Sequence, residues 1–208
     1  MSEPLPIGVL VSGTGTNLQA LIDRVHGRDA RIVGVASNRA EAEGLGRAER
    51  AGIETAAFPV APGEERAARD ERMAGWLAAR DARLVVLAGY MQLLGDEFLD
   101  RFPEAVINVH PSLLPAFPGL AAIEQALAYG ARVFGVSVHF VDGGIDTGPL
   151  ILQEAVSLPD ARDVAGVVAA LRPLEHALLP EAVRLFAQGR LSRDPENPRR
   201  VIVEGGSR

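Results

Sequence analysis

The chain contains no cysteine and no lysine, and each absence excludes a class of chemistry. Without cysteine there is no disulfide, no thiolate nucleophile and no cysteine-ligated metal. All 21 basic residues are arginines, so a lysine Schiff base and the phosphate-binding lysine of a Walker motif are excluded as well. Any reaction that this chain catalyses therefore depends on other side chains.

An excess of positive charge is also lacking, and so are long apolar runs. The formal net charge is -6, which predicts no bulk attraction to nucleic acid or to an anionic membrane. No apolar run approaches membrane-spanning length, and the N-terminal segment MSEPLPIGVLVSG lacks the basic region of a signal peptide. We therefore expect a cytoplasmic protein that binds neither nucleic acid nor membranes.

What the chain does have is a repeated alternation of short β-branched runs with longer, alanine-rich charged stretches. The runs that predict strands are 7–12, 31–37, 54–58, 83–89 and 105–110. The first and fourth of these are almost continuously apolar, as expected where both faces of a parallel sheet are covered. Helices are predicted between them, at 17–27, 40–52 and 64–82. This order predicts an α/β fold with a Rossmann-like, doubly wound, mostly parallel sheet.

The pattern changes after residue 130. Residues 133–142 alternate between apolar and polar, a loop rich in Gly and Asp follows, and 150–158 form a second run, which predicts a long antiparallel hairpin. Residues 164–189 predict a long C-terminal helix, jointed at Pro173. With 48% hydrophobic residues the chain can bury one sizeable core, so we expect a single domain over 1–190. The remainder, 191–208, is predicted to be a polar and mostly loose tail, with a short edge strand at 200–204.

The segment SGTGTNLQAL, residues 12–21, follows the first predicted strand. Gly13 and Gly15 allow a sharp turn, and Thr16 or Asn17 can cap the helix that follows. A plain turn with a capped helix would look the same, but phosphates usually bind at the first βα turn of such sheets, on free N–H groups of a helix N-terminus. Leu18 stands where a third glycine would be needed for a dinucleotide motif, and no acidic residue ends the second strand. The loop therefore favours the phosphate of a mononucleotide.

The segment INVHPSLLP places Asn108 and His110 two residues apart on a predicted strand. Alternate residues of a strand point to one side, so the two side chains should project together, and Pro111 should end the strand. Open α/β sheets bind ligands at the carboxyl ends of their strands. Asn108 could instead start a turn and His110 could bind a backbone carbonyl, but the proline-rich loop that follows favours a functional pair.

Three further segments offer candidates. In HFVDGGIDTGP a carboxylate could orient a histidine, but spacing alone does not choose between Asp142 and Asp146, and His139 on an alternating strand is more typical of packing. GYMQLL, 89–94, could line a pocket for a flat ligand or belong to the core. RPLEHALLP, 172–180, is by itself typical of a solvated helix face.

Together these segments resemble the folate-dependent formyltransferases. The resemblance covers residues 7–190 and depends on the ordered motifs SGTGTNLQAL, SNR, LAGYMQLL, INVHPSLLP, FPG, SVHFVDGGIDTGPLILQ and LEHALLP. The stretch Asn-x-His-Pro-Ser-Leu-Leu-Pro with the later Asp-x-Gly-Pro is specific to the wider family, and the glycine loop resembles that of the phosphoribosylglycinamide formyltransferases. This implies the formyltransferase fold, with 1–104 as the half that binds the nucleotide phosphate and 105–190 as the half that carries the catalytic and folate sites.

The resemblance also implies a reaction: formyl transfer from the co-substrate 10-formyltetrahydrofolate to the amine of glycinamide ribonucleotide, in purine biosynthesis. It implies no metal, and a monomer or homodimer. The residues that match the family are, for catalysis, Asn108, His110 and Asp146; for the ribonucleotide, Gly15, Thr16, Asn17, Arg172 and Glu175; and for the folate, Arg66, Met91, Gln92, Leu93, Leu94 and Asn108. On this match Asp146 rather than Asp142 is the acid, and His139 supports the trio.

The chain departs from the family's usual pattern at four positions, none of which belongs to the trio. Thr14 and Thr16 stand where Asn and Ser are common, Gln92 where Arg is frequent, and Ala121 where His is frequent. In the implied mechanism the amine attacks the formyl carbonyl directly, while Asn108 and a protonated His110 stabilise the oxyanion. The alternatives are a formyltetrahydrofolate hydrolase, a tRNA formyltransferase, and a nucleotide-binding regulator without catalysis.

Overall fold

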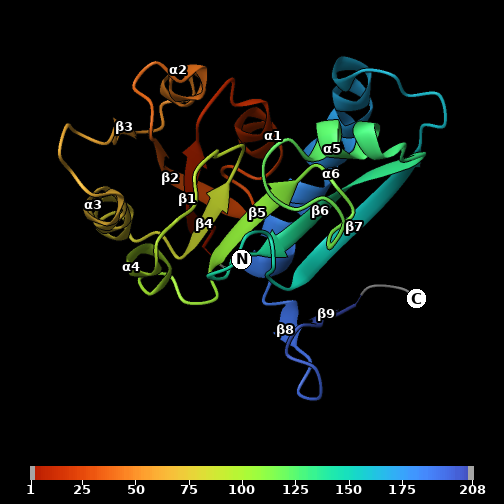
Figure 1. Cartoon of the computed structure of the whole chain (residues 1–208). Helices are drawn as coiled ribbons and strands as arrows, with labels where there is room; N and C mark the ends of the chain where they lie inside the picture. The colour runs from red at the N-terminus through yellow and green to blue at the C-terminus, as the bar shows by residue number, and fades with distance from the viewer. Residues whose placement is uncertain (1–2, 206–208) are drawn as a thin grey trace. The chain divides into compact units, whose positions relative to one another are not determined.

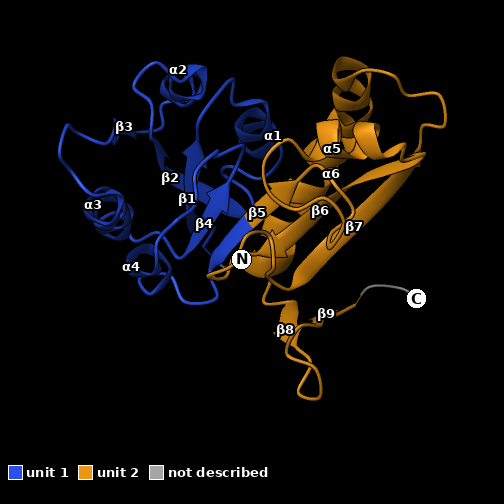
Figure 2. Cartoon of the chain, viewed as in Figure 1, with its two compact units in different colours: residues 1–107 blue, residues 108–208 orange. Residues whose placement is uncertain are grey.

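The structure, a computed structural model, describes residues 3–205. It forms two compact units, residues 1–107 and residues 108–208 (Figure 2). Residues 1–2 lie outside the described residues, and they begin the N-terminal segment considered above. Residues 206–208 of the predicted tail also lie outside them. Within the described part, no helix is both long and apolar enough to cross a membrane.

Unit 1 alternates strands and helices, as predicted (Figure 1). Its elements are β1 (Leu5–Val11), α1 (Thr16–Arg24), β2 (Ala30–Ser37), α2 (Glu43–Arg50), β3 (Thr55–Ala57), α3 (Arg66–Ala78), β4 (Leu84–Leu87) and α4 (Asp96–Leu99). All three strand pairs of the unit are parallel, in the order β3-β2-β1-β4. The short helix α4 is the one element of this unit that the sequence pattern did not predict.

Two glycines let α3 pack closely on the strands of unit 1. A Cβ atom on Gly8 of β1 would lie 2.7 Å from Leu77 Cδ2, and one on Gly34 of β2 would lie 2.7 Å from the Trp76 ring. The Arg80 guanidinium stacks over the Trp76 ring, 3.8 Å from the ring centroid. Val85, which pairs with Gly8, and Val9, which points to the opposite face of the sheet, are both fully buried, so β1 and β4 are covered on both faces.

Unit 2 begins within β5 (Val106–His110) and continues with α5 (Ala122–Tyr129), β6 (Val133–Phe140), β7 (Leu150–Ser157), α6 (Val164–Ala187), β8 (Leu191–Arg193) and β9 (Val201–Val203). Strands β6 and β7 form the predicted antiparallel hairpin, with a register shift between Val138 and His139. With its mostly parallel sheet, this hairpin and the long helix α6, the chain has the predicted α/β fold class. Helix α5 was not predicted.

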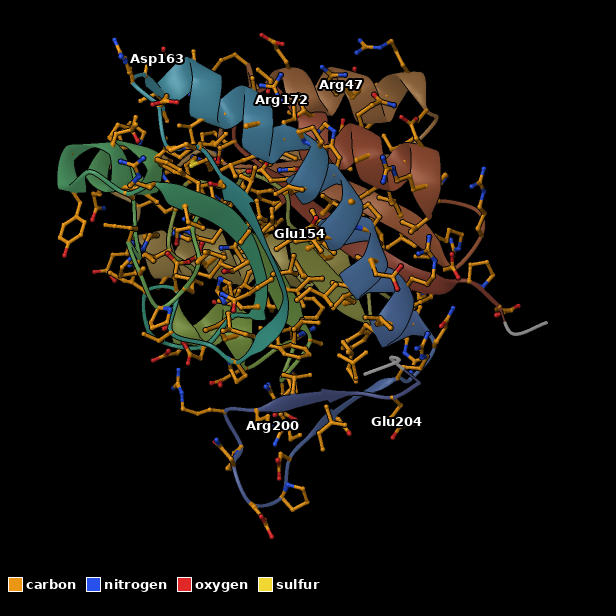
Figure 3. All side chains as sticks on the ribbon, turned by 90° about the vertical axis from the view of Figure 1, so that its right-hand side faces the viewer. Arg47, Glu154, Asp163, Arg172, Arg200 and Glu204 are labelled. Carbon is orange, nitrogen blue, oxygen red and sulfur yellow. The ribbon has the colours of Figure 1, made fainter. Side chains whose placement is uncertain are left out.

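Helix α6 contradicts one prediction, because it runs for 24 residues through Pro173 and Pro180 instead of being jointed at Pro173. It starts after Asp163, whose carboxylate accepts a hydrogen bond from the Gly166 N–H (2.7 Å), and Figure 3 shows Asp163 at this end. A proline inside a helix costs roughly 3 kcal/mol. Leu171 and Leu179, buried on either side of Pro173, offset that cost by packing.

The predicted tail contains more regular structure than expected, because a strand was predicted only at 200–204. Strands β8 and β9 pair in antiparallel fashion, from Leu191 opposite Val203 to Arg193 opposite Val201. The strand predicted at 200–204 is β9, but β8 was not predicted, because three residues between polar neighbours carry too little periodicity to mark a strand.

Candidate active site

Asp146 lies in the loop between β6 and β7, with two histidines and an amide around its carboxylate. Oδ2 accepts a hydrogen bond from the Gly119 N–H (2.8 Å) and lies 3.3 Å from His110 Nδ1. Oδ1 lies 3.4 Å from His139 Nε2 and 3.4 Å from Asn108 Nδ2. The predicted trio of Asn108, His110 and Asp146 is therefore brought together within unit 2.

Strand β5 positions two members of the trio. As predicted, Asn108 and His110 project to the same side, and the strand ends at His110, directly before Pro111. His110 is buried, whereas Asn108 is half-buried and its Nδ2 lies 3.2 Å from His139 Nε2. The alternation of a strand is sufficient to place both side chains at one site.

The carboxylate of Asp146 is ionised at neutral pH. Burial by itself would raise its pKa, but the hydrogen bond from His139, the N–H of Gly119 and the positive charge of His110 together lower the pKa to about 2. The side chain is only 14% exposed, so water screens these interactions little. The site thus presents a negative charge to the ring nitrogens of both histidines.

The hydrogen bonds of the two histidines define which ring nitrogens carry protons. His110 Nε2 lies 2.9 Å from the carbonyl oxygen of Phe117, and because a carbonyl only accepts, Nε2 carries a hydrogen. His139 Nδ1 donates in the same way to the Phe140 carbonyl (2.8 Å), which leaves its Nε2 facing Asn108 and Asp146. Within residues 3–205, no group of three or more His, Asp or Glu side chains is arranged to hold a metal ion.

Strand alternation alone favoured a packing role for His139, whereas the family resemblance implied that it supports the trio. It is 1% exposed, yet it contacts both Asn108 and Asp146. The register shift beside it is a local irregularity of the kind that re-aims a side chain, and strand alternation cannot show it. Asp142, the other candidate acid, instead accepts hydrogen bonds from Thr147 Oγ1 (2.6 Å) and the Gly144 N–H (3.1 Å) inside its own loop.

The glycine loop of unit 1 connects β1 to α1. Gly15 has a left-handed φ of 71° and is itself the N-cap, with no side-chain hydrogen bond at the cap. The predicted cap by Thr16 or Asn17 is therefore wrong, because both residues already lie in the first turn of the helix. The backbone N–H groups of that turn still form the type of anion site expected at a helix N-terminus.

Neighbouring segments hold this loop in shape. A Cβ atom on Gly15 would lie 2.6 Å from the Cα of Gly44 in α2, so only glycine fits there. Arg47, which the sequence did not single out, donates from Nε to the Thr14 carbonyl (2.7 Å). The Gly44 N–H donates to the Gly13 carbonyl (3.0 Å). These contacts fix the loop from the side of α2.

The segment Met91–Leu94 is exposed, in part apolar, and held by buried groups. Its Met91 N–H donates to Ser12 Oγ (2.9 Å), next to the glycine loop. Gln92 Oε1 accepts from Nη1 of the fully buried Arg69 (2.5 Å), which also forms an ion pair with Asp70 (2.7 Å). Met91 and Leu93 are 63% and 48% exposed, whereas Tyr90 is buried, which raises the pKa of its phenol to about 12.

The remaining predicted site residues lie on helices. Arg66 is the exposed first residue of α3 in unit 1. Arg172 and Glu175 lie on α6 in unit 2, exposed and half-buried respectively, and Figure 3 shows Arg172 on this helix. Their spacing of three residues places them on one face of α6.

Comparisons with known proteins agree on one family. Residues 6–183 match the family described as formyl transferase. The chain is 38% identical over 187 residues to the phosphoribosylglycinamide formyltransferase of Haemophilus influenzae, which covers 89% of this chain and 88% of that protein. The crystal structure of glycinamide ribonucleotide transformylase 1 from Symbiobacterium toebii has a TM-score of 0.91 at 45% identity, covering 98% and 95%. A formyltetrahydrofolate deformylase from Pseudomonas syringae has a TM-score of 0.87 at 25% identity, over 97% of this chain but only 66% of that one.

Proposed function

This chain belongs to the formyl transferase family, and from that premise we propose that it is a phosphoribosylglycinamide formyltransferase. It transfers a formyl group from 10-formyltetrahydrofolate to the amine of glycinamide ribonucleotide in purine biosynthesis. The observation that carries the proposal is the convergence of Asn108, His110 and His139 on the ionised carboxylate of Asp146. A protein that only bound a nucleotide would not need this arrangement.

In this proposal the ribonucleotide and the folate are bound by separate segments. Backbone N–H groups at Gly15, Thr16 and Asn17 bind the phosphate, which is supported by the left-handed Gly15 at the start of α1. Arg172 assists the phosphate, and Glu175 binds ribose hydroxyls. The folate is bound by Arg66 and by the exposed Met91–Leu94 segment, whose partly apolar character suits a flat ring.

The chemical step is direct attack of the substrate amine on the formyl carbon. As the new C–N bond forms, negative charge develops on the formyl oxygen, where Asn108 Nδ2–H and His110 Nε2–H donate hydrogen bonds. To reach that oxygen, His110 has to exchange its hydrogen bond to the Phe117 carbonyl for one to the substrate. The C–N10 bond then breaks as N10 receives a proton from His110.

Asp146 acts mainly through its charge. A carboxylate with a pKa of about 2 is a weak base, so it is better suited to hold the imidazolium of His110 than to remove a proton by itself. The proton that the attacking amine loses leaves through water beside the carboxylate. The proton released by the amine restores the proton that His110 gave to N10, and no covalent bond forms between the protein and either substrate.

The assay that tests this function supplies glycinamide ribonucleotide and 10-formyltetrahydrofolate together and follows the formylated ribonucleotide. We expect its formation to depend on both substrates. Release of formate from 10-formyltetrahydrofolate without the ribonucleotide would favour a hydrolase, which the similarity to the deformylase makes the second candidate. No reaction with the substrates would refute the proposal.

Replacing the carboxylate tests the role of the trio. We predict that Asp146→Asn lowers kcat about a hundredfold or more, equivalent to ~3 kcal/mol of barrier, and leaves the Kd for glycinamide ribonucleotide nearly unchanged. Asp142→Asn is the matched control, because the amide oxygen can still accept from Thr147 and Gly144, and it should lose no more than a few-fold. Near-normal turnover in Asp146→Asn would contradict the charge-pair mechanism.

We also propose that the enzyme works in the cytoplasm as a monomer or homodimer, and that residues 1–190 act as one domain. The family match over residues 6–183 supports the single domain. Sedimentation velocity of the purified chain tests the oligomeric state, and a tetramer or larger species would refute that part.

A further inference from the structure

The C-terminal hairpin contacts the loop that carries Asp146. Strands β8 and β9, with the turn between them at 194–200, lie beyond the residues that match the family, 6–183. From this turn Arg199 Nη2 donates a hydrogen bond to the carbonyl oxygen of Thr147 (2.6 Å). Thr147 directly follows Asp146, so a side chain of the tail is bound to the peptide next to the catalytic carboxylate.

The turn that carries Arg199 is held by its own hydrogen bonds. The Arg199 N–H donates to Asn197 Oδ1 (3.1 Å), and the Arg200 N–H donates to the Asn197 carbonyl (2.8 Å). Asp194 closes the turn, because its N–H donates to the Arg200 carbonyl (3.0 Å). The backbone of Arg199 is therefore fixed before its side chain reaches Thr147.

The hairpin is in turn anchored on β6 and β7. Arg200 forms a parallel bridge with Leu150 at the start of β7, and the Arg193 guanidinium lies 4.3 Å from the ring centroid of Phe140 at the end of β6. Arg190 Nε donates to the Glu204 carbonyl (2.7 Å), which joins the two ends of the hairpin; Figure 3 shows Arg200 and Glu204 on it. Arg199 thus projects from a fixed base on the strands that flank the Asp146 loop.

The Asp146 loop needs such support, because its backbone is strained. Asp146 has a φ of 50°, a left-handed conformation that residues with a side chain adopt infrequently, although Asp adopts it more readily than most. Such conformations persist only where the surroundings hold them. At Thr147 the hydroxyl is bound by Asp142 and the carbonyl by Arg199, so the residue after Asp146 is held on two sides.

We propose that Arg199 is a positioning residue for formyl transfer: by holding the Thr147 carbonyl, it keeps the Asp146 carboxylate beside His110 and His139. This inference rests on the proposed function. Arg199 acts through Asp146 and touches no reacting atom. Arg199 also lines a pocket together with Pro118 and Ile145, so binding of an anionic group of a substrate is the rival role that the test has to separate.

The test compares Arg199→Ala, Arg199→Lys and the control Arg200→Ala. We expect Arg199→Ala to lower kcat on the order of ten- to a hundredfold, with KM for both substrates within about twofold, because displacement of a catalytic group mainly affects the chemical step. Arg199→Lys keeps a cationic donor and should recover part of the loss. Arg200→Ala should behave as wild type, because the side-chain ion pair of Arg200 with Asp194 (3.6 Å) lies within the turn and its bridge to Leu150 is made by the backbone.

A double variant tests whether Arg199 acts through Asp146. If it does, Arg199→Ala lowers kcat little further in an Asp146→Asn background, whereas fully multiplicative losses would overturn the proposal. A higher KM with unchanged kcat would also overturn it, in favour of substrate binding. Should Arg199→Ala unfold, Arg199→Gln carries the same comparison, with thermal unfolding as the check on the fold. An inactive wild type would refute the proposed function, whereas an active wild type with a normal Arg199→Ala variant refutes this inference alone.

Discussion

At the scale of single residues, the ionisation of Asp146 is the property on which the site depends. Its pKa is lowered from the ordinary 3.8 to about 2, although burial opposes the shift. Two histidines and one backbone N–H are sufficient to reverse the effect of burial, because all three approach within 3.4 Å of the carboxylate oxygens. The same contacts that prepare the site for catalysis therefore also stabilise the folded chain.

This shift predicts how stability changes with pH. Because the folded pKa lies below the unfolded value, the carboxylate stabilises the fold above about pH 4, and this contribution is lost as the pH falls toward 2. We expect Asp146→Asn to lower the free energy of unfolding by about 2 kcal/mol at neutral pH, and the gap to wild type to shrink below about pH 4. Urea unfolding of both proteins across this range measures the gap. A gap that stays constant down to pH 3 would show that the histidine contacts do not stabilise the charge.

At the scale of elements, close approach of helices decides which residues are tolerated in the loops. Gly15 and Gly27 have nearly the same left-handed φ, 71° and 73°. They differ in their surroundings, because an added Cβ meets the Gly44 Cα at 2.6 Å in the first case and nothing within 4 Å in the second. The glycine at the start of α1 is thus required by the backbone of α2 as well as by its own conformation.

Replacing Gly15 and Gly27 by alanine separates the cost of the left-handed backbone from the cost of the close contact with α2. Gly27→Ala should destabilise the fold by about 1–2 kcal/mol, the cost of the left-handed conformation. Gly15→Ala should cost more than that, because α1 and α2 have to move apart, and it should also weaken ribonucleotide binding. Chemical unfolding and calorimetry of ribonucleotide binding measure both effects. Equal losses of stability in the two variants would mean that the approach of α2 is not tight.

The ion pair of Arg69 and Asp70 is a second feature at the element scale. Both side chains are fully buried, Asp70 Oδ2 also accepts from the Gly95 N–H (3.0 Å), and Arg69 Nη2 has no hydrogen-bond partner. We predict that Asp70→Asn destabilises the fold by about 3–5 kcal/mol, because it leaves a buried guanidinium without its counter-charge. Glu64→Gln, which removes the surface pair with Arg72, is the control and should leave the urea midpoint unchanged. A small effect of Asp70→Asn would show that water reaches Arg69.

At the scale of the whole molecule, the net charge argues against a tRNA formyltransferase. The net charge is -6, and the cations are arginines without exception, many of them paired with acids, such as Arg80 with Glu54. A tRNA formyltransferase would need a basic surface to bind its substrate. The composition therefore agrees with a small ribonucleotide as the formyl acceptor.

This charge balance predicts that the chain does not bind polyanions. We expect no retention on heparin and no binding to tRNA in a low-salt buffer near pH 7, because binding to phosphates requires an excess of cations on one face. A gel-shift titration with tRNA measures this. Binding that weakens steeply with added salt would contradict the prediction and would support a nucleic acid as the substrate.

Much of the fold and of the candidate site could be predicted, because periodicity and turn chemistry are local properties. The strands β1, β2, β4 and β5 lie within a few residues of their predicted positions, and strand alternation brought Asn108 and His110 to one side. The short elements α4 and β8 were missed, since three or four residues carry little periodicity. The joint expected at Pro173 is absent, because the local cost of proline is offset by burial on both sides of it.

The amino-acid sequence by itself determined the fold class, the paired Asn108 and His110 and, through its motifs, the family, because these depend on the order and spacing of residues along the chain. Tertiary structure alone decided that the Gly119 N–H meets the Asp146 carboxylate, and that Arg199 of the tail binds the next peptide. The physical reason is distance along the chain. Arg199 and Thr147 are separated by 52 positions, and no pattern of neighbouring residues encodes a contact that only the docking of β9 on β7 creates.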